Sequence, residues 1–72
     1  MKKYVIIVEK TKTGFSSFCP DLPGCIATGK TKKSCETAMH KAIQFHLEGI
    51  LQEGLRLPKS NSYSKIIEIK AA

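Results

Sequence analysis

The chain has 72 residues and a formal net charge of +6, because twelve Lys and Arg residues outnumber six Asp and Glu residues. Hydrophobic residues make up 42% and charged residues 25% of the sequence, which excludes a disordered chain and indicates one small folded domain. No apolar run approaches the ~20 residues of a membrane-spanning helix. No secretion signal is visible at the N-terminus, so we expect a cytoplasmic protein.

Three short segments with the chemistry of β-strands come first. Residues 3–9 contain an unbroken aromatic and β-branched run, which predicts a strand with two apolar faces. Residues 15–19 and 25–29 predict two further strands. The run between them, Pro-Asp-Leu-Pro-Gly at residues 20–24, is dense in turn-forming residues. We expect these three strands to form an antiparallel meander.

The clearest element is a long helix over residues 32–53. Thr31 is a favourable N-cap, apolar residues recur at helical spacing, and Gly54 suits the C′ position. The capping box is predicted to be incomplete, because Ser34 and not Glu or Gln stands three residues after Thr31. Residues 63–70 predict a fourth strand, which a right-handed crossover would place parallel to the first. The expected fold class is α+β, in the order β-β-β-α-β, with a mixed four-stranded sheet and one helix on one face.

The apolar content of this sheet exceeds what one helix can shield. A single helix covers only one face of a sheet, yet the first and last strands carry apolar side chains on both faces. Large uncovered apolar patches are rare on monomers, so we expect the folded unit to dock against another copy or a partner protein. The residues predicted for an oligomer face are Tyr4, Ile6, Ile67 and Ile69.

No catalytic or metal centre is predicted. Glu9 and Asp21 lack the additional carboxylates of a two-metal nuclease site, and we interpret Asp21 as a turn residue that bonds its own backbone. The three cysteines, an odd number without a secretion signal, are interpreted as small buried apolar residues. Their spacing relative to the histidines does not suit zinc, and His46 is interpreted as a core or interface residue. We expect a non-enzymatic protein without a cofactor.

Several motifs resemble the HicB antitoxin family. They are Gly14-Phe15, Pro20-Asp21-Leu22-Pro23-Gly24-Cys25, Thr28-Gly29 with Thr31 at the helix start, Ala42-Ile43, His46-Leu47-Glu48-Gly49, and Gly54 with Pro58. The resemblance covers nearly the whole chain. It implies a partial ribonuclease H-like fold without catalytic activity, within a bacterial toxin–antitoxin system. It also implies a homodimer or larger oligomer, and a HicA-like mRNA-cleaving toxin as the protein partner.

The resemblance also suggests which residues contact a partner. The residues predicted to contact the toxin are Phe15, Phe18, Pro20, Asp21, Leu22 and Pro23. Many family members carry a C-terminal DNA-binding segment, and because this sequence stops at Ala72 we expect a short form without it. The positive charge, with Lys30, Lys32 and Lys33 near the helix start, supports an alternative function. That alternative is a stand-alone basic nucleic-acid-binding module or regulator.

Overall fold

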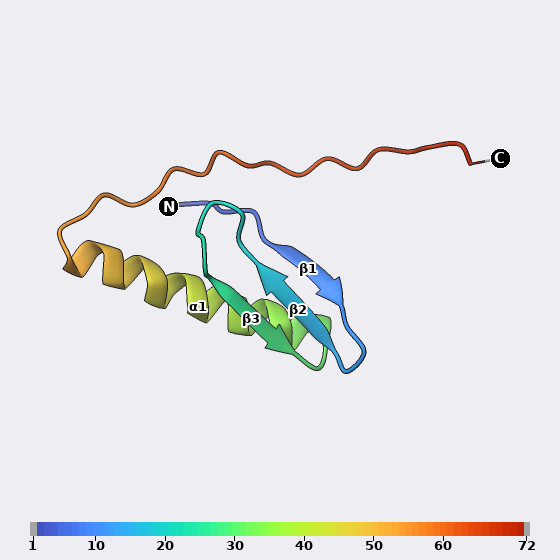
Figure 1. The fold of residues 1–72 in the computed structure, drawn as a ribbon, viewed down its shortest axis with the longest axis horizontal. Helices are drawn as coiled ribbons and strands as arrows, with labels where there is room; N and C mark the ends of the chain where they lie inside the picture. The colour runs from blue at the N-terminus through green and yellow to red at the C-terminus, as the bar shows by residue number, and fades with distance from the viewer. Residues whose placement is uncertain (1, 72) are drawn as a thin grey trace.

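A computed structural model describes residues 2–71 of the chain. Its elements, in chain order, are β1 (Ile7–Lys10), β2 (Phe15–Phe18), β3 (Ile26–Gly29) and α1 (Lys32–Gln52). The strands form an antiparallel sheet in the order β1-β2-β3, and α1 packs against one face of it (Figure 1). The predicted meander and the α+β class are confirmed. Within residues 2–71, no helix has an apolar stretch of the length that a bilayer demands.

The predicted fourth strand is wrong, and with it the mixed four-stranded sheet. Residues 53–71 contain no strand, and Figure 1 shows this C-terminal stretch passing the N-terminal residues and then running clear of the body. A strand exists only where its backbone pairs with a neighbour, however suitable its residues are. The same reason shortens the first strand to Ile7–Lys10. β2 ends at Phe18, opposite Ile7, so residues 3–6 have no strand beside them.

The register of the sheet sorts its side chains into two faces. Val8 lies opposite Ser17, and Ser17 lies opposite Ala27. Residues directly opposite each other point to the same side of a sheet. Ser17 is only 1% exposed, and its hydroxyl donates to the Ala27 carbonyl at 3.1 Å. The row of Val8, Ser17 and Ala27 therefore lies on the face of the sheet that α1 covers.

The core lies between that face and the first half of α1. Its buried apolar members are Cys19, Leu22, Cys25, Cys35 and Met39. The interpretation of all three cysteines as small buried apolar residues is confirmed, and all three are free thiols. The helix also approaches the sheet very closely, because a Cβ atom added at Gly29 would lie 2.5 Å from the Cys35 nitrogen. Glycine is required at this contact between β3 and α1.

Both ends of α1 are capped by local hydrogen bonds. The Thr31 hydroxyl accepts from the Ser34 backbone N–H, and the Ser34 hydroxyl accepts from the Thr31 N–H, each at 3.0 Å. The capping box is therefore complete, because a serine hydroxyl replaces the usual carboxylate. At the other end Gly54 has φ +74°, and the Leu55 N–H donates to the Ile50 carbonyl at 3.1 Å. This is the Schellman arrangement, and it confirms the predicted C′ position.

Candidate protein-interaction site

The uncovered face of the sheet carries an apolar row. Ile7, Phe18 and Ile26 lie opposite one another in the register, on the side away from α1. Phe18 is 39% exposed and Ile26 is 68% exposed, while Ile7 is half-buried. We call this row the open face. Ile26 was not among the predicted contact residues, although the alternation in residues 25–29 was enough to place it opposite Ala27.

The turn between β2 and β3 extends the open face at one end of the sheet. Backbone hydrogen bonds tighten it, with the Leu22 N–H donating to the Cys19 carbonyl and the Cys25 N–H donating to the Leu22 carbonyl, both at 3.1 Å. Pro20 and Pro23 are exposed, whereas Leu22 has no exposed surface. Leu22 was predicted to contact a partner, but in this structure it anchors the turn in the core. Within this turn, the exposed surface that a partner could contact is that of Pro20 and Pro23.

Asp21 joins this turn to a distant part of the chain. Its carboxylate accepts hydrogen bonds from the backbone N–H groups of Asn61 and Ser62, both at 3.2 Å, and from the Ser62 hydroxyl at 3.1 Å. We call these three bonds the Asp21 clasp. The interpretation that Asp21 bonds its own turn is wrong, because its partners lie forty residues away. The Asp21 carboxylate is therefore already engaged in hydrogen bonds within the chain.

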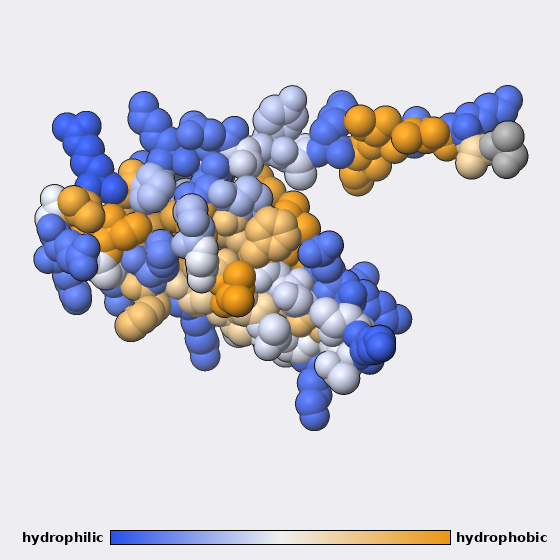
Figure 2. All heavy atoms as spheres, viewed as in Figure 1, coloured by the Kyte–Doolittle hydropathy of each residue, from blue (hydrophilic) through white to orange (hydrophobic). Residues whose placement is uncertain are grey.

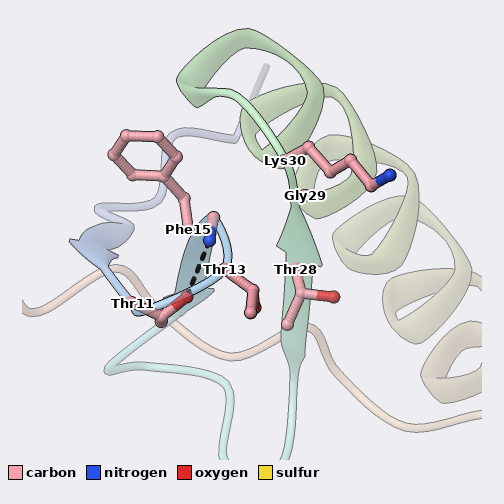
Figure 3. A pocket seen from close by; sticks show the side chains of 7 residues that line it. Thr11, Thr13, Phe15, Thr28, Gly29 and Lys30 are labelled. Carbon is pink, nitrogen blue, oxygen red and sulfur yellow. Dashed lines mark hydrogen bonds between the residues drawn. The ribbon is translucent and has the colours of Figure 1, made fainter.

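Phe15, the remaining predicted contact residue, lies at the other end of the sheet. It is half-buried on the α1 side and pairs with Gly29. It lines a cavity of about 310 Å³ whose other walls are Thr11, Thr13, Gly14, Thr28, Gly29 and Lys30. Figure 3 shows the Phe15 ring and the Lys30 side chain pointing in different directions, and the Gly14 N–H donating to the Thr11 hydroxyl at 3.1 Å. Phe15 is therefore not continuous with Phe18 and the two prolines.

The four residues predicted for an oligomer face fall into two separate groups. Tyr4 and Ile6 are half-buried and pack against the core, and the Tyr4 hydroxyl donates to the Pro58 carbonyl. Ile67 is 73% exposed and Ile69 is 82% exposed. The structure does not bring these two pairs together, because the fourth strand that would have joined them is not formed.

The last described residues form an apolar segment with little contact to the rest of the molecule. We call residues 63–71 the tail. Its Tyr63 is 86% exposed and its Ile66 is 90% exposed. In Figure 2 the apolar part of the tail, coloured orange, stands clear of the body. The tail is thus an exposed apolar surface in addition to the open face, and Phe45, Leu51 and Leu55 are further exposed apolar residues of the described chain.

The titratable groups include one buried thiol whose pKa departs from its ordinary value. Desolvation by burial, helped by the neighbouring Cys19, raises the pKa of the Cys25 thiol above its ordinary value. A raised thiol pKa lowers the thiolate fraction and hence the reactivity. Among residues 2–71 no three His, Cys, Asp or Glu side chains lie close enough to share a metal ion. His46 is half-buried on α1 and His40 is exposed.

Comparison with known proteins decides the family. Residues 4–71 match the model of the HicB-like antitoxin of bacterial toxin–antitoxin systems. The chain belongs to the HicB-like antitoxin family. The match spans the sheet, the turn, α1 and the tail of this HicB-like chain. The resemblance seen in the sequence motifs is thereby confirmed.

Similar proteins occur in phage, archaea and bacteria. A 14.9 kDa protein of Haemophilus phage HP1 is 39% identical over 64 residues, which are 89% of this chain and 48% of the phage protein. This chain therefore spans about half the length of that relative. A UPF0150 protein of Thermoplasma acidophilum is 33% identical over 83% of this chain and 88% of its own length. A UPF0150 protein of Helicobacter pylori is 33% identical over 92% of this chain and 93% of its own length.

A solved structure supports the same family. This HicB-like chain matches a chain of the HicA3 and HicB3 toxin–antitoxin complex with a TM-score of 0.70 and 32% sequence identity. The likeness covers 83% of this chain and 70% of the solved one. The shared fold is the three-stranded antiparallel sheet with its long helix.

Proposed function

We propose that this chain binds a HicA-like toxin in the cytoplasm and neutralises it by protein–protein contact. The observation that carries the proposal is the combination of a family match over residues 4–71 with the likeness to a chain of a HicA3–HicB3 complex. The exposed apolar surface supports it, since a contiguous apolar patch on a small protein marks a site of association.

The open face and the adjoining turn are the surface we propose for the toxin. Phe18 and Ile26 supply exposed apolar area, and Pro20 and Pro23 border it with rigid backbone. Aromatic side chains that become fully desolvated dominate the energy of many interfaces, so Phe18 is the expected anchor. The surface needs no excess of acidic residues to work, which fits a chain whose net charge is +6.

The experiment is co-expression with the HicA-like toxin of the neighbouring reading frame. The chain should restore growth and co-purify with the toxin, and Phe18→Asp should weaken binding by about 2 kcal/mol, or roughly 30-fold, in titration calorimetry. Phe45→Asp is the matched control, because Phe45 is 79% exposed but lies on α1, away from the open face. Its affinity should equal that of the unmodified chain.

Two results would contradict the proposal. One is the absence of any complex, with toxicity unrelieved. The other is an equal loss of binding in the two phenylalanine variants, which would exclude the open face. A titration at low and high salt separates the toxin from a nucleic-acid partner. Phosphate contacts predict a steep fall in affinity with salt, whereas an apolar interface changes little.

A further inference from the structure

A second cavity is formed by the N-terminal residues and the middle of α1. Its volume is about 560 Å³, and its walls come from residues 2–4 and from His40, Ile43, Gln44 and Leu47. These four positions recur at helical spacing, so they lie on one side of α1. None of the lining residues belongs to the open face or to the tail. Pockets for small molecules measure roughly 300–1,000 Å³, so the size of this N-terminal cavity suits a small ligand.

The floor of the N-terminal cavity is apolar and is held by the packed body of the molecule. Tyr4, Ile43 and Leu47 are half-buried and pack against the core. The Tyr4 hydroxyl donates to the Pro58 carbonyl, which fixes the residue in place. Ile43 and Leu47 are one turn apart on α1. A ligand that covers this floor needs an apolar body.

The rim of the same cavity is cationic. Lys2 and Lys3 are exposed on the N-terminal wall, and His40 is exposed on the α1 wall. Within residues 2–71, the lining contains no Asp or Glu side chain that would pair with the two lysines. A lysine ammonium has three N–H donors and no acceptor, and an imidazole N–H adds a further donor. The rim is therefore complementary to a negatively charged group.

We propose that the N-terminal cavity binds a small amphipathic anion, in the form of an aliphatic chain with one anionic head group. The chain lies on the floor formed by Tyr4, Ile43 and Leu47, and Lys2 and Lys3 hold the head group. An inorganic anion would leave the apolar floor uncovered, and a neutral hydrocarbon would leave the lysines without a partner. The ligand must therefore combine both features. This site is separate from the surface proposed for the toxin.

The first test is titration calorimetry of the full chain with octanoate as the probe. Saturable binding of one octanoate per chain is expected. Acetate carries the head group alone and octanol carries the aliphatic chain alone, so each should bind about ten-fold more weakly or worse. Octyl phosphate is titrated in parallel, and the tighter of the two anions identifies the head group as carboxylate or phosphate.

The second test uses variants of the cavity. Lys2→Gln with Lys3→Gln should weaken octanoate binding about five- to ten-fold and leave octanol binding unchanged, because only the anionic head group loses partners. Lys10→Gln with Lys12→Gln is the matched control. It removes the same charge from two exposed lysines that do not line the cavity, and octanoate affinity should stay the same.

A third variant, Gln44→Trp, fills the cavity from an exposed position on α1. It should abolish octanoate binding while the circular dichroism spectrum keeps its helical signal. Three results would each overturn the proposal: no saturable binding of either anion, equal affinity for octanoate and acetate, or an equal loss in the two double-lysine variants. The last would mean that net charge and not the cavity attracts the anion. All titrations use the chain alone, so their outcome does not depend on toxin binding.

Discussion

At the scale of single residues, the Asp21 carboxylate links two parts of the chain that are far apart in sequence. Backbone N–H groups of Asn61 and Ser62 both donate to it, and the Ser62 hydroxyl adds a third bond. A carboxylate that accepts backbone N–H groups makes charge-assisted hydrogen bonds, which are stronger than neutral ones. Asp21 is half-buried, so water screens part of this gain. Its main effect is to set the direction in which the tail leaves.

We predict that Asp21→Ala releases the C-terminal segment without unfolding the sheet or α1. The free energy of unfolding should fall by about 1 kcal/mol, the usual size for partly exposed hydrogen bonds. Hydrogen exchange at the Asn61 and Ser62 amides should accelerate far more than exchange in α1. Glu9→Ala is the control, because Glu9 is an exposed carboxylate on β1 that has no role in the clasp. Equal exchange rates at both amides in the two variants would show that the clasp does not hold the segment.

The part of the site that depends on Asp21 could not have been predicted from the sequence. The turn chemistry of residues 20–24 was visible, and it fixed where the carboxylate would be. Its partners were not, because a local pattern carries no information about a backbone N–H forty residues away. Ser62 offers no signal beyond being a polar residue after Pro58. By contrast, Ile26 could have been found, because strand alternation is a local property.

At the scale of elements, the helix was predictable and the strand ends were not. Every signal for α1 is local: the Thr31 cap, the apolar spacing and the Gly54 stop all act within one or two helical turns. Only the Ser34 hydroxyl in the capping box was misjudged, because its role was assigned to Glu or Gln alone. Strand length depends on the neighbour, so residues 3–6 and 63–70 kept strand-like sequences without becoming strands.

The contact between β3 and α1 gives a prediction at this scale. A Cβ atom at position 29 would lie 2.5 Å from the Cys35 nitrogen and 2.8 Å from its Cα, both backbone atoms that cannot rotate away. Gly29→Ala should therefore lower the free energy of unfolding by about 1–3 kcal/mol, through the forced shift of α1. Urea denaturation measures this directly. Gly49→Ala is the matched control.

Gly49 lies inside α1, where an added Cβ meets nothing within 4 Å. The control substitution should stabilise the protein by about 0.5–1 kcal/mol, because alanine is the better helix former. The two variants add the same methyl group and differ in sign only through the surroundings of the glycine. If Gly29→Ala were neutral, α1 would not be held against β3 by the close backbone approach that the structure shows.

At the scale of the whole molecule, the open face and the tail are two distinct exposed apolar surfaces. The open face crosses all three strands through Ile7, Phe18 and Ile26, on the side of the sheet away from α1. The tail begins just after the Asp21 clasp, and its apolar part stands clear of the body (Figure 2). The tail is therefore an apolar surface separate from the open face.

We predict that substitutions in the open face weaken toxin binding and that substitutions in the tail do not. Phe18→Asp should weaken toxin binding by about 2 kcal/mol and leave the mass of the free chain unchanged. Ile67→Lys with Ile69→Lys should leave the affinity for the toxin within about 0.5 kcal/mol of its original value, because substitutions at distant sites act independently. Light scattering and titration calorimetry on both variants measure the two effects. A tail variant that lost toxin affinity as strongly as Phe18→Asp would mean that the tail is part of the toxin site, and the two surfaces would then have to be treated as one.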